Sequence, residues 1–346
     1  MAEDNLNLNE DYFKYDPQNM RQAILDIPEQ VEQGYKTVEA LDLRKAGGKY
    51  SSVLIAGMGG SAIAGLLLKS FLAEDKTRID VVQDYTLPAW VDKQTLMIAC
   101  SYSGNTEETL SVYKEARRKG CDMISVTTGG KLAEYARVSN LIVVEVPKGY
   151  QPRAAMAFQF FVMLRLLERL RLVESRAQQV LKLKEDLKVQ LQSLEKNAII
   201  LSEKVLHKTP LVYTSKRFEA IGYRWKCQFN ENSKTQAFYH VFSEMNHNEM
   251  QGFENLRGTY HVIFLRFDED HRRIQKRMSL VKEMLFKKGI SDTDIIIRGT
   301  SLLSKMFSAI LLGDLTSYYL ALRLKTNPTD VSLIEDFKNR LGPWVA

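Results

Sequence analysis

Cysteine is scarce in this sequence: only Cys100, Cys121 and Cys227 occur in 346 residues. They form no Cys-x-x-Cys pair and have no histidine at a spacing typical of a zinc site. An odd number of scattered cysteines argues against both a disulfide framework and a structural zinc ion. We therefore expect a reduced, cytoplasmic protein that uses no metal and no cofactor.

Long apolar runs and blocks of like charge are also missing. The longest apolar stretch, residues 154–167, is interrupted by Gln159 and Arg165, and it falls short of the ~20 residues of a membrane helix. Residues 1–15 are acidic and polar, unlike a secretory signal. The net charge of +6 is spread along the chain. This pattern predicts no membrane span and no nucleic-acid partner, whereas a mild positive excess suits small anions.

Short apolar runs alternate with helical patterns in the first half of the chain. Runs typical of buried strands cover residues 52–56, 79–82, 96–100, 123–126 and 141–146, and helical patterns cover 61–72, 107–119 and 152–172. Surface helices are expected over 17–45, with a break at Pro28. Such an alternation predicts a parallel sheet with helices on both faces.

A second alternation begins after Pro210. Strands are expected at 211–214, 261–265 and 294–297, and helices at 218–227, 272–288, 302–323 and 332–341. A charged helix at 176–196 carries an apolar stripe that we expect to pack against a domain or a second subunit. The prediction is two doubly wound α/β domains, 1–172 and 206–346, joined by a helical connector at 173–205. The two domains show no sequence repeat.

The first loop with a chemical signature is Gly57-Met58-Gly59-Gly60-Ser61, between a strand and a helix. Glycines let backbone amides approach an anion closely, and a helix N-terminus adds partial positive charge. The dinucleotide template G-x-G-x-x-G fails because its third glycine is replaced by Ala62, and there is no Walker Gly-Lys-Ser/Thr. The loop therefore indicates a small anion or a plain tight turn.

The second loop offers three hydroxyls, from Ser101, Ser103 and Thr106, again between a buried strand and a helix. Each hydroxyl can donate a hydrogen bond to a phosphate, although Thr106 alone would also suit a helix N-cap. Two such loops at neighbouring strand ends lie where α/β sheets bind ligands. Residues 127–131 form a third turn of this type. Together the loops predict a phosphate-binding site.

These motifs resemble the sugar isomerase (SIS) domain. The resemblance rests on Gly-Met-Gly-Gly-Ser and on Ser-Tyr-Ser-Gly-Asn-Thr-Glu-Glu-Thr, and it extends to Val146-Pro147-Lys148 and Pro152-Arg153-Ala154-Ala155. It implies two SIS-type domains, in which the phosphate is held by Gly59, Gly60, Ser61, Ser101, Ser103 and Thr106. Arg153 would then stabilise negative charge near the reacting carbons.

Candidates for proton chemistry lie in residues 224–249. Isomerising an aldose to a ketose needs a carboxylate base, a group that opens the sugar ring, and a cation for the enediolate. Glu231 stands between Asn230 and Asn232, which could orient it by hydrogen bonds, and His247 stands in a second Asn-rich run. From the pattern alone, either residue could equally be a solvated surface side chain.

The chain as a whole resembles the bifunctional phosphoglucose/phosphomannose isomerase family, from Met20 and Ile-Pro-Glu-Gln at 27–30 to the C-terminal helix. The resemblance implies that the chain interconverts glucose 6-phosphate, and mannose 6-phosphate, with fructose 6-phosphate through a cis-enediol. Glu231 would move the C1/C2 proton. His247 would open the ring from the other subunit of a homodimer. A lysine on the last helix would assist at the ring oxygen; Lys338 fits best and Lys325 is the alternative.

One departure and three alternatives accompany this resemblance. Family members that also convert mannose 6-phosphate carry a threonine seven residues before that lysine, where this chain has Val331; Thr329 and Ser332 are the nearby hydroxyls. The alternatives are a non-catalytic sugar-phosphate-binding SIS protein, an SIS isomerase of another sugar phosphate, and a nucleotide-binding oxidoreductase. The first usually carries a DNA-binding domain, for which no segment is spare. The second would lack the runs around Glu231 and His247 together. The third would need the last glycine of the dinucleotide motif and a carboxylate for the ribose, and this chain has neither.

Overall fold

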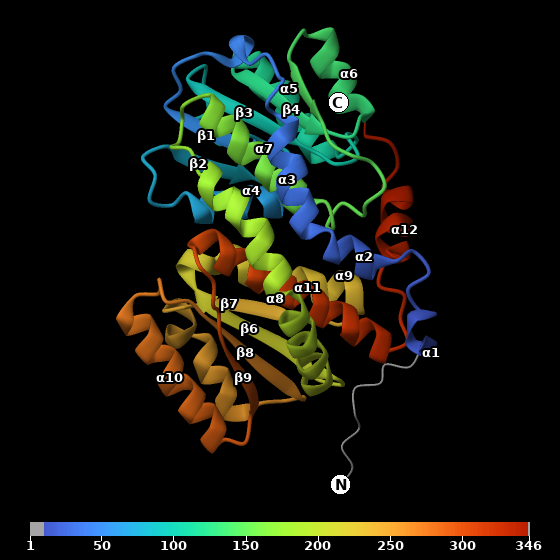
Figure 1. Cartoon of the computed structure of the whole chain (residues 1–346), viewed down its shortest axis with the longest axis vertical. Coiled ribbons are helices and arrows are strands. Elements are labelled where there is room, and N and C mark those ends of the chain that lie inside the picture. The colour runs from blue at the N-terminus through green and yellow to red at the C-terminus, as the bar shows by residue number, and fades with distance from the viewer. Residues whose placement is uncertain (1–9, 345–346) are drawn as a thin grey trace. The chain divides into compact units, whose positions relative to one another are not determined.

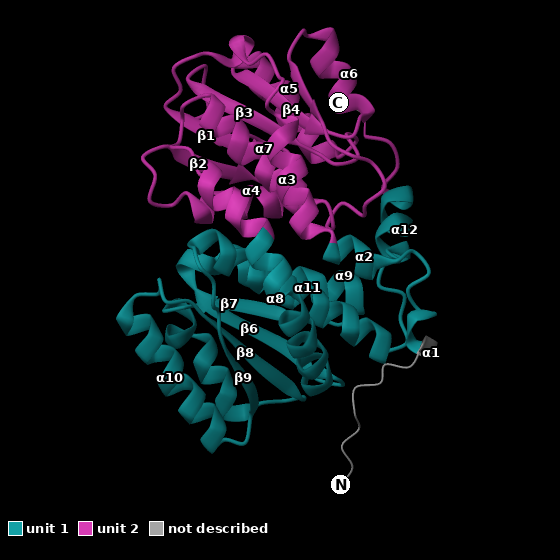
Figure 2. Cartoon of the chain, in the orientation of Figure 1, with its two compact units in different colours: residues 1–25, 185–340 teal, residues 26–184, 341–346 magenta. Residues whose placement is uncertain are grey.

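The computed structural model describes residues 10–344, which divide into two α/β units (Figures 1 and 2). Within this range, unit 1 comprises residues 10–25 and 185–340, and unit 2 comprises residues 26–184 and 341–344. The division falls inside the long helix α8 (Ala177–Val205), which runs through the expected connector. The expected class of two parallel-sheet α/β domains is confirmed.

Unit 2 contains a five-stranded parallel sheet in the order β2-β1-β3-β4-β5. Its strands are β1 (Ser52–Ala56), β2 (Arg78–Val82), β3 (Thr95–Cys100), β4 (Asp122–Thr127) and β5 (Ile142–Glu145). Every residue of β1 and β3 is buried, which explains why both read as continuous apolar runs. Because β1 lies between β2 and β3, the chain reverses its direction of winding between β1 and β3.

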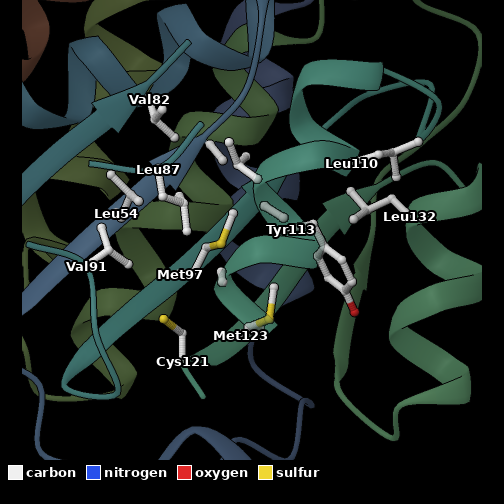
Figure 3. Close-up of a cluster of buried hydrophobic side chains, with 14 residues drawn as sticks. Leu54, Val82, Leu87, Val91, Met97, Leu110, Tyr113, Cys121, Met123 and Leu132 are labelled. Atoms are coloured by element: carbon white, nitrogen blue, oxygen red, sulfur yellow. The ribbon is translucent and has the colours of Figure 1, made fainter. Parts of the chain in front are cut away.

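Helices cover both faces of this sheet (Figure 1). They are α3 (Ile27–Thr37), α4 (Gly59–Phe71), α5 (Glu107–Arg118), α6 (Gly130–Val138) and α7 (Met156–Arg169), with a short 3-10 helix η1 (Arg44–Ala46) before β1. Helix α7 packs against α3 and α4, whereas α5 contacts β3 and α6 contacts β4. Figure 3 shows one buried cluster of this unit, to which Leu110 of α5 and Leu132 of α6 belong together with the strand residues Leu54, Met97 and Met123.

Unit 1 repeats this winding in a four-stranded parallel sheet, β7-β6-β8-β9. The strands are β6 (Thr209–Ser215), β7 (Phe238–Phe242), β8 (Tyr260–Arg266) and β9 (Ser291–Ile296). The helices are α1 (Glu10–Phe13), α2 (Met20–Leu25), α9 (Glu219–Ser233), α10 (Arg272–Lys287), α11 (Leu302–Arg323) and α12 (Ser332–Leu341), with 3-10 helices η2 (Lys216–Phe218), η3 (Glu244–His247) and η4 (Glu249–Asn255). Helix α11 is buried on nearly every side, and α12 has no buried residue.

Several observed boundaries differ from the expected ones, and three of them concern candidate residues. Helix α4 begins at Gly59 rather than at residue 61, so both glycines lie in its first turn. Helix α7 begins at Met156 rather than at 152, which leaves Arg153 in the preceding turn. Helix α9 continues to Ser233, so Glu231 is helical.

Other differences have local physical causes. Pro28 does not break a helix: it lies in the first turn of α3, where its missing N–H costs nothing, and the break falls at Asp26. Strand β7 was not predicted because only Val241 and Phe242 in it are buried, which leaves no apolar run. Helix α6 was also missed, since Gly129 and Gly130 at its start read as a turn.

Candidate active site

The first loop of unit 2 turns directly from β1 into α4. Met58 precedes the helix in an extended conformation and its side chain makes no capping hydrogen bond within the described chain. The first amides of a helix have no intrahelical acceptor, so those of Gly59 and Gly60 are available to an anion. Gly59 has φ +51°, a left-handed conformation that glycine adopts without strain. Ser61, in the same turn, is 3% exposed.

Ser61 lies beside the end of the neighbouring strand β3. Burial raises the pKa of the Cys100 thiol to about 12, and a hydrogen bond with the Ser61 side chain partly opposes that shift. Cys100 is the last residue of β3 and is followed at once by the hydroxyl-rich loop. The two candidate loops therefore meet at the carboxyl ends of β1 and β3, the point where the winding reverses.

The second loop is held by its own hydroxyls. Ser101 Oγ lies 2.9 Å from Thr106 Oγ1 and accepts a hydrogen bond from the Gly104 amide at 3.1 Å. The Asn105 amide donates to Ser103 Oγ at 3.3 Å. Thr106 occupies the N-cap position of α5, but within the described residues its side chain makes no capping hydrogen bond. The hydroxyls thus shape the loop rather than close the helix.

The turn that carries Arg153 lies against the first loop. A Cβ atom on Gly60 would stand 2.6 Å from the Pro152 carbonyl oxygen and 2.8 Å from Arg153 Cα. Only glycine at position 60 therefore permits this approach without displacing the turn. Arg153 itself is 3% exposed. A guanidinium that is buried so deeply beside a helix N-terminus favours an anionic ligand.

Two supports fix this turn, and the sequence did not point to either. Gln30 of α3 donates to the Ala154 carbonyl at 2.8 Å and accepts from the Phe158 amide at 3.2 Å. The Tyr102 hydroxyl donates to the Pro147 carbonyl at 2.9 Å and accepts from the Tyr150 amide at 3.0 Å. Gln30 ends the Ile-Pro-Glu-Gln run and Tyr102 lies within the serine loop, so both stand inside motifs already noted, without a role assigned to them.

Unit 2 therefore brings together the candidate residues Gly59, Gly60, Ser61, Ser101, Thr106 and Arg153, with Ser103 on the exposed side of the second loop. Backbone amides, neutral hydroxyls and one buried cation converge there. This combination can hold a phosphate by hydrogen bonds and helix dipoles, and Arg153 adds a cation for further negative charge.

In unit 1, Glu231 is half-buried near the C-terminal end of α9. This helix is fixed against α11. Trp225 packs so closely on Gly313 that a Cβ there would lie 2.5 Å from the indole, and its Nε1 donates to the Ala309 carbonyl at 2.9 Å. Arg224 Nε donates to Asp314 Oδ1 at 3.1 Å, and both side chains are almost fully buried.

The backbone next to Glu231 is also anchored to the segment that precedes α12. Lys234, with φ +52°, ends α9 and donates to the carbonyls of Glu231 at 2.8 Å and Asn327 at 2.6 Å. The flanking amides reach different acceptors: Asn230 donates to the Thr235 carbonyl and Asn232 to Ser317 Oγ. Asn327 in turn accepts from the amide of Thr329, a buried residue.

The two lysine candidates lie on either side of Asn327 and Thr329 in the chain. Lys325 is exposed with φ +55° and lies two residues after the end of α11. Lys338 is exposed on α12, which buries none of its residues. Val331, at the position where the resemblance implies a threonine, is half-buried.

His247 lies at the other edge of the unit 1 sheet. It ends η3, which follows the carboxyl end of β7, whereas α9 returns to the amino edge, where β7 begins. The five residues of β7 span about 16 Å. His247 is exposed and lines a cavity of about 300 Å³ together with Met250, Phe253 and Leu285. Within one chain, Glu231 and His247 are therefore not brought together.

Residues 10–344 contain neither a candidate metal site nor a candidate membrane span. No group of three or more His, Cys, Asp or Glu side chains is arranged to hold a metal ion. No helix in this part of the chain combines the length and apolar character needed to cross a membrane.

Two family models match the chain. The SIS domain matches residues 49–169, and the bacterial phospho-glucose isomerase C-terminal SIS domain matches residues 194–341. The bifunctional phosphoglucose/phosphomannose isomerase of Caldicellulosiruptor bescii is 41% identical over 338 residues, which cover 93% of this chain and 99% of that protein. The protein of the same description from Aquifex aeolicus is 36% identical and covers 90% of this chain and 99% of its own length.

Among solved structures, tagatose-6-phosphate ketose/aldose isomerase from Escherichia coli is similar in fold. Its TM-score is 0.69 at 16% identity, over 94% of this chain and 96% of the other. At this identity the likeness concerns the fold alone, which agrees with the two parallel-sheet units described above.

Proposed function

Because the chain belongs to the bifunctional phosphoglucose/phosphomannose isomerase family, we propose that it interconverts glucose 6-phosphate and mannose 6-phosphate with fructose 6-phosphate. The observation that carries the proposal is the phosphate-binding geometry of unit 2, where two loops and the Arg153 turn converge at one sheet edge. The relatives match almost the whole chain, so both units are covered by the likeness.

The substrate phosphate binds to the first loop through Gly59, Gly60 and Ser61, and to the second loop through Ser101, Ser103 and Thr106. Helix α4 and helix α5 both begin at this point, so their dipoles favour the dianion. These donors are neutral, so the positive charge of Arg153 remains available for the end of the sugar at which the proton is transferred. Arg153 stabilises the enediolate oxygen that develops during proton transfer.

Glu231 is the base that removes the proton from C2 of the aldose and returns it to C1 of the cis-enediol. The protonated carboxyl gives the same proton back, so no net proton or electron is exchanged with solvent. The rigid attachment of α9 to α11 supports this role, because a base must hold its position within about 0.5 Å. Lys338, or Lys325 in its place, assists at the ring oxygen.

A homodimer in which His247 acts in the neighbouring chain's site is the finer part of this proposal. The separation of Glu231 and His247 on opposite edges of the unit 1 sheet supports it. Exposed apolar residues on α10 supply a surface for a second copy near the His247 cavity: Leu280, Met284 and Phe286. The three unpaired cysteines and the sugar-phosphate substrate favour a cytoplasmic site of action, which cell fractionation would test.

The mannose half of the activity requires a group that tolerates both configurations at C2. Val331 cannot donate a hydrogen bond, but Thr329 is buried and its amide is held by Asn327, the residue linked through Lys234 to the end of α9. We assign to Thr329 the hydroxyl that the family places seven residues before the lysine.

The test is turnover of fructose 6-phosphate to glucose 6-phosphate in a coupled assay with EDTA present. Glu231→Gln preserves shape and removes the base, so we expect kcat to fall about 10²- to 10⁴-fold. The matched control is Glu203→Gln, which removes an exposed carboxylate on α8 whose ion-pair partner, Arg323, lies 3.6 Å away. This variant should keep wild-type rates. Wild-type protein that binds fructose 6-phosphate without converting it would refute the isomerase and leave a sugar-phosphate sensor.

A further inference from the structure

Unit 1 contains a cavity at the position that corresponds to the phosphate site of unit 2. In both sheets the first strand lies between the second and the third, so β6 and β8 occupy the places of β1 and β3. Ligands of α/β sheets bind at the carboxyl ends of strands at this reversal point. In unit 1 a cavity of about 840 Å³ lies there, in the size range of small-molecule sites. We call this cavity the switch pocket. The residues that define it are Ser215, Arg217, Glu269, Asp270 and His271.

The switch pocket cannot bind phosphate as the first loop of unit 2 does. After β6 the chain continues as Lys-Arg-Phe, without a glycine turn, and after β8 it continues as Phe-Asp-Glu-Asp-His in place of the serine-rich loop. Four carboxylates line the pocket against one lysine and one arginine. Carboxylates repel a dianion at short range, so this edge of unit 1 suits a different ligand.

Three buried oxygens of the pocket lack a hydrogen-bond partner of normal geometry among the described residues. Asp270 is 5% exposed; its Oδ2 accepts from the Phe267 amide at 3.0 Å, while its Oδ1 has no partner. Glu269 Oε1 accepts from Lys305 at 2.8 Å, while its Oε2 has none. Ser215, 4% exposed, faces the Asp270 carboxyl. Burial raises the pKa of that carboxyl, and a hydrogen bond from the Ser215 hydroxyl partly lowers it, although the contact is too long or bent to satisfy either oxygen fully. Each carboxylate is thus fixed by one oxygen and has the other unused.

Buried acceptors of this kind call for a ligand that donates hydrogen bonds. The described residues around them form no group of three or more metal-ligating side chains, so a coordinated ion does not fit the set. An ammonium group pairs well with a buried, oriented carboxylate, because the hydrogen bond is charge-assisted. Hydroxyl groups of a ligand can bond to Ser215 and to His271 in the pocket. His271 Nδ1 accepts a hydrogen bond from the Arg273 amide, so Nε2 carries the proton and can donate to such a hydroxyl.

We propose that the switch pocket is a second ligand site, which binds a small hydroxylated amine without phosphate, of the amino-sugar type. The ammonium contacts Asp270 and Glu269, and ring hydroxyls contact Ser215 and His271. The site lies at the carboxyl edge of the unit 1 sheet, away from Glu231 at the amino edge, and it does not depend on the proposed isomerase activity.

Calorimetric titration of the full chain with D-glucosamine tests the proposal, in inorganic phosphate to occupy the loops of unit 2. We expect saturable binding with the low affinity that is typical of so small a ligand. D-glucose, which has the hydroxyls but no ammonium, should bind at least tenfold more weakly. Asp270→Asn should weaken glucosamine binding at least tenfold. The matched control is Asp268→Asn, which removes the neighbouring, exposed carboxylate outside the pocket and should leave the affinity unchanged.

Ser215→Ala is the second variant, which keeps the test valid if Asp270→Asn does not fold. Absence of saturable heat with D-glucosamine would overturn the proposal. So would equal affinity for D-glucose, or glucosamine binding that persists unchanged in both variants, because the ligand would then lie elsewhere. The isomerase rate of the variants is measured separately, so failure of this site and failure of the proposed reaction remain distinguishable.

Discussion

The substitution Gly60→Ala should change the geometry of the phosphate site, and hence turnover, with little effect on the stability of the protein. The substitution adds one methyl group in the first turn of α4. That methyl would lie 2.6 Å from the Pro152 carbonyl oxygen and 2.8 Å from Arg153 Cα. Both atoms belong to backbone, so the clash cannot be relieved by rotating a side chain, and the turn that carries Arg153 must move.

The size of that movement follows from the distances. Ordinary contact begins at 3.4 Å, so the Pro152 carbonyl must retreat by 3.4 − 2.6 = 0.8 Å. A displacement of about 1 Å at a catalytic group costs about 10²-fold in rate. We therefore expect kcat to fall about 30- to 100-fold. Stability should change little, because overpacking costs about 1–3 kcal/mol and alanine regains about 1 kcal/mol of helix propensity.

Gly65→Ala is the matched control. It lies in the same helix, and its added methyl meets Ile55 Cγ2 at 2.8 Å, inside the core and away from the phosphate loops. Both variants should lose a similar few degrees of thermal midpoint, but only Gly60→Ala should lose turnover. The assay is coupled conversion of fructose 6-phosphate, with kcat and KM determined for each variant beside its melting temperature.

Wild-type kcat in a folded Gly60→Ala protein would refute the reasoning, because the approach of the Arg153 turn to α4 would then be irrelevant to the reaction. An equal loss of turnover in Gly65→Ala would also refute it, since a shared instability would explain both results. A rise in KM alone would mean that this contact serves phosphate binding and not the charge that develops on the sugar.

Three further predictions concern unit 1 and the assembly. Burial, with Lys208 and Lys204 nearby, lowers the pKa of His261 to about 4. As the pH falls, the unfolded chain therefore binds a proton at this histidine before the folded chain does. The free energy of unfolding should fall by up to about 3 kcal/mol between about pH 6.5 and pH 4. Urea midpoints of His261→Gln should lack that slope, and an unchanged slope would exclude this residue. Glu231→Gln and His247→Ala, each inactive alone, should regain about a quarter of wild-type turnover when co-expressed, since half of the dimers are mixed and hold one intact site; no regain would contradict a shared site. Thr329→Val should lower mannose 6-phosphate turnover at least about tenfold relative to glucose 6-phosphate, and Thr329→Ser should restore it; equal losses on both sugars would contradict the assignment.

The elements that the sequence predicted well are those whose burial is complete. Strands β1 and β3 are buried on both faces, so all their residues except the first, Ser52 and Thr95, are apolar, and each run is easy to recognise. Strand β7 escaped detection for the opposite reason, because most of it is only partly buried at an edge of the sheet. Helix α9 was predicted too short, since its last turn carries polar residues, Asn230 to Ser233, that are used for contacts with α11 and the loop after it.

Prediction of the candidate site had a different limit. The phosphate loops were visible because glycine and hydroxyl residues at strand ends have a local signature. The supports of Arg153 had none: Gln30 acts from a helix more than a hundred residues earlier, through two hydrogen bonds to backbone. A glutamine on a surface helix is unremarkable until the fold shows what lies beneath it. The separation of Glu231 from His247 likewise depends on the direction of α9 relative to β7, which no local pattern encodes.

The two units show how one winding can be put to different uses. Both sheets reverse between their first and third strands, yet in unit 2 the carboxyl edge there holds glycines and hydroxyls, and in unit 1 it holds buried carboxylates. The candidate base of unit 1 lies instead at the amino edge, on a helix end that is fixed by Trp225 and the Arg224–Asp314 ion pair. If Glu231 and His247 act on one substrate, the length of β7, which separates the two edges on which they stand, favours a site that a second chain completes.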